Sequence, residues 1–508
     1  MGSAVGEPAE EVTEHHGRFR LKRGVTLRQH AAHGTLVNGA FNAGLTGLAF
    51  LKGFVLAAFL SPSDYGIWGI LLISLGTLTW LKQVGISDKY IQQEDLDQEQ
   101  AFHRAFTLEL VVNGVLFAVL LVAVPLMALI YGRPELLLPG FAMCLIVPGG
   151  QLQVPFWVLY RRLEFARQRR LQVVDPLVAF VVTVALAIAG AGYWSLVLGV
   201  LIGTWVGAVI AVRSSPYPLR LDYDAATMRS YVAFSTPLFV ASLGGIVIAQ
   251  GSIFFSESAI GLVGAGVVTL AAQISMLSQR VDDVVSSTLY PVICSVRDRR
   301  DLLFETFEKS NRLALMWAMP FGFGLALFAG DLVTFVLGDR WEPAVVVLQG
   351  TGVAAAVTQL GFNWTSYVRA LGDTRPIAVN SLVQAVVFLA TVPLMYRYGL
   401  AGYAVAVLFL AVASLAVRGV YLARIFDRFA MARHSARAVL PALPALAVVL
   451  LLRAFDAGTE RTGLMAMAEL AAYGLATLAA TWAFERTLLR EAVGYLRRRS
   501  APAAPVAS

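Results

Sequence analysis

Charged residues are scarce in this sequence of 508 residues. Asp, Glu, Lys and Arg make up only 14% of it and hydrophobic residues 57%, whereas about a quarter of a soluble domain is charged. The chain therefore lacks the polar surface that a water-soluble globule needs, and lipid must be the solvent of most of it. Its basic residues stand in short clusters between apolar runs, which argues against a nucleic-acid partner.

The sequence also lacks the motifs of most enzymes and metal sites. It contains no GxxxxGK[ST] phosphate loop, no HExxH and no cluster of cysteine with histidine, so we expect no nucleotide hydrolysis, no metal and no cofactor. Cys144 and Cys294 lie in or beside apolar segments and are expected to be small apolar fillers. Of the six histidines, His103 and His434 are predicted to lie solvated in cytoplasmic loops and the others in the polar leader.

Apolar stretches of about 20 residues, the length that crosses ~30 Å of hydrocarbon, recur along the whole chain. They predict an all-α polytopic membrane protein with about 14 transmembrane helices. No loop between them is long enough to carry a soluble active site, so we do not expect an enzyme. The predicted spans are 36–60, 66–82, 105–130, 136–160, 171–190, 193–212, 231–255, 262–285, 313–336, 344–367, 377–396, 400–421, 438–453 and 463–484.

The distribution of basic residues gives an orientation to this helix map. Of the 40 Lys and Arg residues, 34 fall in alternate loops and helix ends, 5 fall on the opposite side, and Lys52 lies within the first helix. Cytoplasmic loops of membrane proteins carry the excess of Lys and Arg. The split therefore predicts a multi-pass protein of the bacterial inner membrane with both termini in the cytoplasm.

Short matches at similar offsets indicate an internal duplication. Ala191-Gly192-Tyr193 recurs as Ala401-Gly402-Tyr403, and Tyr160-Arg161 is echoed by Tyr367-Val368-Arg369. Such repeats are typical of transporters and predict two pseudo-symmetric six-helix lobes followed by two C-terminal helices. The predicted divisions are a polar cytoplasmic leader at 1–35, an N-terminal lobe at 36–229 (helices 1–6), a C-terminal lobe at 230–425 (helices 7–12), helices 13 and 14 at 426–490, and a cytoplasmic tail at 491–508.

Polar side chains inside the predicted spans are costly in lipid and are candidates for a substrate path. In helix 4, Gln151 and Gln153 lie beside Pro148 and Pro155, in a broken stretch whose freed carbonyls need partners. Each candidate has the alternative of serving only as a bond between helices or as an anchor at a helix end. The substrate-cavity candidates are Asn38, Asn42, Lys52, Gln151, Gln153, Gln250, Arg280, Arg312, Asn363 and Arg369, and Glu109 is the ion-coupling candidate.

Five segments carry a resemblance to a known family, and they are Leu60–Gly66, Val84–Ser87, Tyr160–Phe165, Tyr290-Pro291 and Gly338–Pro343. They resemble polysaccharide flippases of the multidrug/oligosaccharidyl-lipid/polysaccharide exporter superfamily. The likeness is to the branch that exports colanic-acid-like and teichuronic-type units and extends over essentially residues 30–490. The chain departs from this branch at Gln250, where relatives often carry an acidic residue.

The resemblance implies an alternating-access flippase. Its substrate would be a polyprenyl-diphosphate-linked oligosaccharide moved from the cytoplasmic to the periplasmic leaflet, with membrane lipids and polysaccharide polymerase or assembly proteins as further partners. Cations such as Lys52, Arg280 and Arg312 would attract the diphosphate. The alternatives are an ion-coupled drug or cation antiporter and a peptidoglycan-precursor flippase of the same superfamily, a membrane glycosyltransferase, and a scaffold of an assembly complex.

Overall fold

The structure, a computed structural model, is helical almost throughout the residues that it describes. Helices and short helical turns make up its regular structure, and none of these residues forms a strand. The predicted all-α class is confirmed. The described residues are 41, 44, 45, 47–49, 51–81, 86, 87, 90, 97–162, 164–225, 229, 248–279, 293, 299–361, 363–371, 375–426, 429–455 and 460–499.

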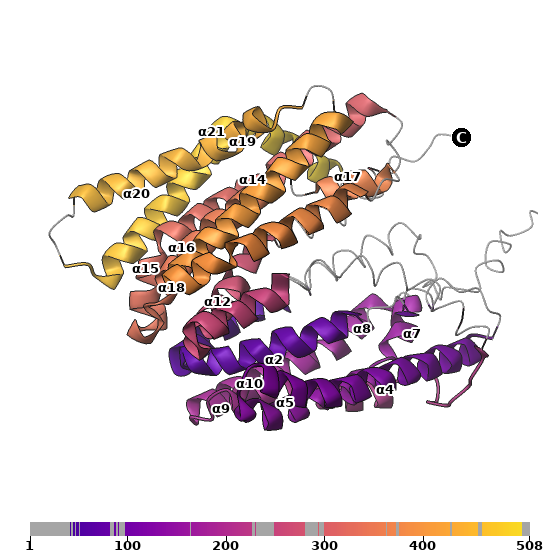
Figure 1. Cartoon of the computed structure of the whole chain (residues 1–508). Coiled ribbons are helices and arrows are strands. Elements are labelled where there is room, and N and C mark those ends of the chain that lie inside the picture. Colours follow the sequence, from indigo (N-terminus) through magenta and orange to yellow (C-terminus); the bar gives the residue numbers. More distant parts are fainter. Residues whose placement is uncertain are drawn as a thin grey trace, which may run out of the picture. The chain divides into compact units, whose positions relative to one another are not determined.

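The chain divides into two compact units, shown with their helices in Figure 1. The first unit comprises residues 1–52 and 75–240, and the second comprises residues 53–74 and 241–508. Helix α2 (Pro62–Leu81) has residues in both. The domain boundaries given by the sequence remain predictions.

The first unit is built around one long helix and a set of shorter ones. Its elements are α4 (Gln98–Ile130), η1 (Pro134–Leu136), α5 (Leu137–Cys144), α6 (Ile146–Gln151), α7 (Phe156–Arg161), α8 (Phe165–Gln172), α9 (Val174–Ile188) and α10 (Trp194–Arg213).

In the second unit, α20 and α21 pack along each other and against α14 (Figure 1). The elements of this unit are α12 (Leu262–Ser275), η2 (Met276–Gln279), α14 (Arg300–Leu327), α15 (Ala329–Leu332), η3 (Val333–Leu337), η4 (Asp339–Trp341), α16 (Ala344–Thr358), α17 (Trp364–Ala370), α18 (Arg375–Ile425), α19 (Met431–Val439), η5 (Leu440–Ala442), α20 (Leu443–Phe455) and α21 (Gly463–Arg499).

Several helices are longer than the apolar runs that predicted them. Helix α4 begins seven residues before the predicted start, where the side chain of Asp97 accepts hydrogen bonds from the N–H groups of Glu99 (3.1 Å) and Gln100 (3.0 Å). This cap satisfies donors that are left free at a helix start. Hydropathy marks only the part of a helix that crosses lipid, so it misses polar turns such as these.

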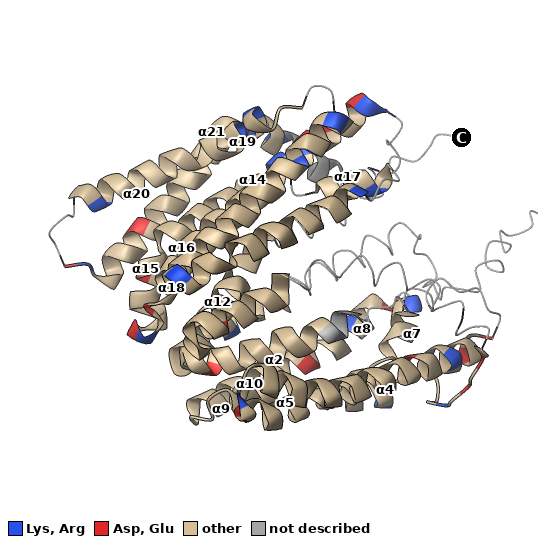
Figure 2. Cartoon of the chain, viewed as in Figure 1, with Lys and Arg blue, Asp and Glu red and all other residues tan. Residues whose placement is uncertain are grey.

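Membrane-spanning character is plain in the described part of the chain. Seven of its helices are long and apolar enough to cross a membrane, and the bent pair Arg300–Leu327 and Ala329–Leu337 makes an eighth if it is one span. Charged side chains gather near helix ends, and the middles of the helices carry few (Figure 2). The chain is therefore a multi-pass membrane protein, while the number 14 stays a prediction.

Helices α9 and α10 lie close together because α10 presents glycines at every fourth position. A Cβ at Gly203 would lie 2.7 Å from the carbonyl oxygen of Asp175, and one at Gly199 would overlap the hydroxyl of Thr183. Glycines with this spacing let two membrane helices approach closely. The approach brings the carboxylate of Asp175 against α10.

Two of the segments that carry the family resemblance contact each other within the second unit. Ser61 and Asp64 form a reciprocal cap at the start of α2, in which Asp64 Oδ2 accepts from the Ser61 N–H at 3.0 Å. The ring of Tyr65 meets that of Trp341 edge-on, with centroids 5.2 Å apart. Trp341 Nε1 donates to the carbonyl oxygen of Ala57 at 2.9 Å. This bond satisfies a carbonyl at the end of the helix that precedes α2.

Candidate functional site

The fourth predicted helix is broken in the first unit, as its prolines and glycines predicted. Helix α6 ends at Gln151 and α7 begins at Phe156, with a turn at residues 152–155 between them. The backbone N–H groups of Gln153 and Val154 bond three residues back, to Gly150 at 3.0 Å and Gln151 at 3.3 Å. Non-helical backbone at membrane depth needs protein partners for its polar groups.

Gln151 is one of the side chains that hold this break. It is almost fully buried, and its Nε2 donates to the carbonyl oxygen of Phe106 on α4 at 3.2 Å. Its Oε1 accepts from Asn113 Nδ2 at 2.5 Å, and the same amide also donates to Glu109 Oε1 at 3.3 Å. Asn113 therefore links the ion-coupling candidate Glu109 to Gln151 at the break.

Gln153 reaches the opposite side of the break. Its Nε2 donates to Asp175 Oδ2 at 3.0 Å and to the carbonyl oxygen of Thr204 on α10 at 3.1 Å. Asp175 was missed as a candidate. Its signal in the sequence is a carboxylate five residues into the predicted span 171–190, close to the basic segment that precedes this span.

The tenth predicted helix is broken in the second unit by a similar arrangement. Helix α16 ends at Thr358 and α17 begins at Trp364, with Gly361 between them at a φ of 68°. The break starts at Gln359, 207 positions after Leu152, which is also the separation of Tyr160 and Tyr367. The two units therefore carry a helix break at matching places in the sequence.

Asn311 on α14 holds this second break and is fully buried. Its Oδ1 accepts from the Gly361 N–H at 3.3 Å, and its Nδ2 donates to Asn363 Oδ1 at 3.3 Å. The candidate Asn363 in turn donates to Ser310 Oγ at 2.6 Å. Buried amides with this many partners fix one geometry of the surrounding backbone.

The prediction that His103 and His434 lie solvated is wrong for both residues. Each is buried, with 9% of its surface exposed. His434 Nε2 lies 2.5 Å from Asn311 Oδ1, and His103 Nε2 lies 3.0 Å from the carbonyl oxygen of Pro218. Packing of α19 against α14 buries His434, and hydropathy gives no signal of this because the segment around it is polar.

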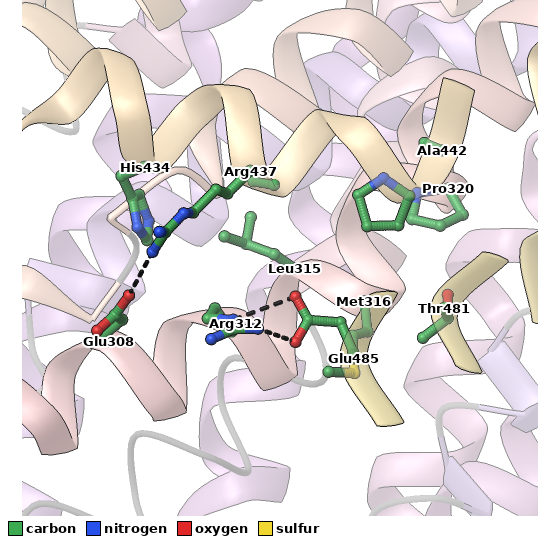
Figure 3. Close-up of a pocket in the computed structure, with 12 residues that line it drawn as sticks. Glu308, Arg312, Leu315, Met316, Pro320, His434, Arg437, Ala442, Thr481 and Glu485 are labelled. Carbon is green, nitrogen blue, oxygen red and sulfur yellow. Dashed lines mark hydrogen bonds and ion pairs between the residues drawn. The ribbon is translucent and has the colours of Figure 1, made fainter. Parts of the chain in front are cut away.

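A small pocket opens beside this network, between α14, α19 with η5, and α21 (Figure 3). The guanidinium of the candidate Arg312 donates two hydrogen bonds to the carboxylate of Glu485. In one of them the distance between Nε and Oε1 is 3.1 Å. Arg437 Nη1 lies 3.2 Å from Glu308 Oε1. Both basic groups are therefore compensated, and the pocket carries less positive charge than the sequence suggested.

The other candidates have different surroundings. Lys52 is partly buried and Arg369 is exposed, and neither has a hydrogen bond or ion pair with any residue that the structure describes. Gln250 Nε2 donates to the carbonyl oxygen of Ile73 at 3.2 Å. Asn38, Asn42 and Arg280 lie outside the described residues.

A cluster of ion pairs links the C-terminal end of α20 and the N-terminal end of α21 to α15. Arg453 lies 2.8 Å from Asp331 and 3.0 Å from Glu469, and Arg461 lies 2.7 Å from Glu469 and also grips Asp331. The hydrogen bonds with Asp331 and then Glu469 raise the pKa of the Arg461 guanidinium above its usual value. These ion pairs connect α20 and the start of α21 to α15.

Cys144 is a buried free thiol, as the apolar-filler interpretation predicts, and Cys294 lies outside the described residues. No group of three or more metal-binding side chains occurs in the part of the chain that the structure describes.

Comparison with solved structures identifies the fold. The chain matches the inward closed conformation of the lipid II flippase MurJ with a TM-score of 0.63 and 13% identity, over 89% of this chain and 99% of that one. It matches an inward-facing multidrug resistance MATE transporter with a TM-score of 0.61 and 14% identity, over 75% and 94% of the two chains. The fold is that of these membrane transporters.

Comparison of sequences identifies the family. The chain is 24% identical over 491 residues to the succinoglycan biosynthesis transport protein ExoT of Rhizobium meliloti (strain 1021), which covers 91% of this chain and 94% of ExoT. It is 22% identical over 352 residues to the lipopolysaccharide biosynthesis protein WzxC of Escherichia coli (strain K12), covering 66% and 69%. The family model described as polysaccharide biosynthesis protein matches residues 55–346, more than half of the chain. The chain therefore belongs to this polysaccharide biosynthesis protein family.

Proposed function

We propose that this protein is an alternating-access flippase. It moves a polyprenyl-diphosphate-linked oligosaccharide from the cytoplasmic to the periplasmic leaflet of the bacterial inner membrane, and both of its termini lie in the cytoplasm. It supplies units for surface polysaccharide assembly, where a polymerase and assembly proteins are its partners. Its task is translocation, and no covalent bond of the substrate changes.

The observation that carries this proposal is the matching pair of helix breaks. Discontinuous helices in corresponding places of two repeats mark the substrate region of many transporters. In the first unit, Gln151 and Gln153 connect the break to carbonyl oxygens of α4 and α10. In the second, Asn311 accepts from the Gly361 N–H in the break and donates to Asn363. The transporter fold and the family membership support the same conclusion.

The candidate residues have distinct roles in this proposal. Lys52 and Arg369 attract the anionic diphosphate, because their cations have no partner among the described residues. Arg312 contributes when its carboxylate partner Glu485 is displaced, and Glu109 is a site of ion coupling. The remaining substrate-cavity candidates bind polar groups of the sugar, and they are Asn38, Asn42, Gln151, Gln153, Gln250, Arg280 and Asn363.

Proteoliposomes that contain the purified protein test the proposal. The probe is undecaprenyl diphosphate linked to an N-acetylglucosamine that carries a fluorophore, and dithionite outside the vesicles bleaches only the outer leaflet. Without flipping, about half of the fluorescence is protected. We expect the protein to make nearly all of it accessible.

The same vesicles separate the proposal from its rivals. Lipid II labelled in the same way tests a peptidoglycan-precursor flippase, for which the likeness to MurJ provides the motive. Ethidium efflux tests a drug antiporter, an alternative that the likeness to the multidrug transporter suggests. Transport of ethidium or of lipid II with no movement of the oligosaccharide probe would overturn the proposal.

A further inference from the structure

Asp175 is a carboxylate within a candidate membrane span. Helices α8 and α9 together form the span Phe165–Ile188, and from residue 176 to its end this span carries no charged residue. Asp175 is partly buried, and no described residue forms an ion pair with it. An ionisable side chain at such a place is expensive, and membrane proteins keep it mostly where it has a function.

The one side-chain hydrogen bond of Asp175 with a described residue connects it to the first helix break. Gln153, which lies in the turn between α6 and α7, donates Nε2 to Asp175 Oδ2 at 3.0 Å. The same nitrogen donates its second hydrogen to the Thr204 carbonyl at 3.1 Å. The Gln153 amide therefore connects the turn between α6 and α7 to α9 and α10. Its partner on α9 is the titratable carboxyl group of Asp175.

The neighbouring helix is shaped around this contact. A Cβ at Gly207 would lie 2.9 Å from Gln153 Nε2 and 3.0 Å from Asp175 Cβ, and one at Gly203 would lie 3.0 Å from Asp175 Oδ1. All three distances are shorter than ordinary van der Waals contacts. Any larger residue at these positions would displace the carboxylate or the amide.

No cation among the described residues forms an ion pair with Asp175. Helix α10 presents Gly203, Thr204 and Gly207 to it, and the break presents Gln153; none of these side chains titrates. On its own span the nearest charged residues in the sequence are Arg170 and Arg169. Arg169 Nη1 donates to Gln172 Oε1 at 2.8 Å, and its guanidinium lies over the Phe41 ring at 4.7 Å. A carboxyl group without a cation is less costly in its neutral form.

We propose that Asp175 binds and releases a proton during transport and that Gln153 transmits this change to the break between α6 and α7. The proposal rests on the function proposed above and adds a proton-binding carboxyl group to the ion-coupling candidate Glu109. The proton comes from water on one side of the membrane, joins a carboxylate oxygen of Asp175, and leaves to water on the other side. No other bond is made or broken.

The geometry explains how protonation reaches the backbone. The ionised carboxylate only accepts, so it holds the Nε2 of Gln153. The protonated carboxyl gains an O–H that can donate to Gln153 Oε1, and charge-assisted hydrogen bonds are about twice as strong as neutral ones. Protonation therefore weakens the hold on the amide and lets the break take a second arrangement.

Infrared difference spectroscopy of the full-length protein in lipid nanodiscs tests proton binding without any substrate. Between alkaline and acid pH we expect a carbonyl-stretch band of a protonated carboxyl group that Asp175→Asn removes. Glu135→Gln is the matched control, since Glu135 pairs with Arg133 at a helix end outside the candidate spans. A band that is unchanged in Asp175→Asn would overturn the assignment.

Transport measurements then test coupling. In the proteoliposomes described above, an imposed pH gradient should raise the wild-type flipping rate several-fold and leave the Asp175→Asn rate unchanged, with the Glu135→Gln rate as responsive as the wild type. An equal response of Asp175→Asn would refute the coupling. A wild type that moves no oligosaccharide probe would count against the proposed function alone, because the infrared band is read without substrate.

A second variant guards against a folding failure of Asp175→Asn. Gln153→Leu keeps the carboxyl group and removes the amide that favours its ionised form, so the infrared band should titrate at a higher pH than in the wild type. An unchanged midpoint would mean that Gln153 does not act on Asp175.

Discussion

Oδ1 of Asn311 accepts a hydrogen bond from the backbone N–H of Gly361, at 3.3 Å and across 50 residues of sequence. This bond lies at the break between α16 and α17, where Gly361 cannot make the regular helical bond. Asn311→Ala should therefore leave the Gly361 N–H, Oδ1 of Asn363 and Nε2 of His434 without their partner on Asn311. Each buried polar group that loses its partner costs about 1–3 kcal/mol of stability. The thermal unfolding temperature in nanodiscs is the measurement.

Ser310→Ala is the comparison for this variant, since the Ser310 hydroxyl accepts from Asn363 and, among the described residues, bonds to neither Gly361 nor His434. Its unfolding temperature should fall less. Equal decreases of the unfolding temperature in the two variants would show that Asn311 does not stabilise the break between α16 and α17 more than Ser310 does.

The Arg312–Glu485 pair makes opposite predictions for its two members. If Arg312 meets the diphosphate, Arg312→Ala should raise the KM for the oligosaccharide probe, whereas Glu485→Gln should free the guanidinium and lower it. A buried pair that serves only packing should instead lose stability in both variants without changing KM. Flipping rates at several probe concentrations, corrected for protein amount, decide between these outcomes.

Lys52→Ala and Arg369→Ala should each slow flipping several-fold while the amount of protein in the membrane stays the same. The reason is that each removes a cation that has no partner among the described residues and is free to meet an anionic headgroup. Lys52→Arg keeps the charge and should retain most of the rate. Full flipping by both alanine variants would show that neither cation contacts the substrate.

Gly207→Ala should destabilise the first unit by about 1–3 kcal/mol, because its Cβ would press on Gln153 and Asp175. Gly114→Ala on α4 is the matched control. A Cβ there would meet nothing within 4 Å, and alanine favours the helix over glycine by about 1 kcal/mol. Comparable unfolding temperatures of the two variants would contradict the close approach of α10 to this pair.

The ion cluster around Arg461 predicts no loss of stability at moderately alkaline pH. A base whose pKa is raised in the folded protein contributes stability below its unfolded pKa, and the contribution is lost only as pH rises through the folded pKa. For Arg461 both values lie far above pH 9. Arg461→Gln should lower the unfolding temperature by a similar amount at pH 7 and pH 9, since the cation is charged at both. A loss confined to one pH would contradict this.

Local sequence signals located much of the first break but not the second. Pro148, Gly149, Gly150 and Pro155 predicted the interruption around Gln151, because proline and glycine disfavour a continuous helix wherever they stand. The interruption at Gly361 has a single glycine and no proline nearby. Its geometry depends on Asn311, which is 50 residues away, and no property of the segment itself reveals that partner.

The sequence identifies candidate residues but does not show which partners they have in the folded protein. Gln151, Gln153 and Asn363 were recognised because an amide in an apolar run is conspicuous, and each of them bonds at a break. Arg312 was recognised for its charge, but the carboxylate that compensates it comes from α21, 173 positions further on. His434 was assigned to water because its neighbours are polar, and the contact of α19 with α14 buries it.

The sequence by itself determined the solvent, the class and the approximate helix positions of this protein. Those properties follow from composition and from the length of apolar runs, which act on each segment independently through the cost of placing polar groups in lipid. Only the tertiary structure decided which polar groups meet: Gln153 with Asp175, Asn311 with Gly361, Arg312 with Glu485. Such pairs depend on the packing of helices that are distant in sequence, because a buried polar group is stabilised by the partner that packing brings to it.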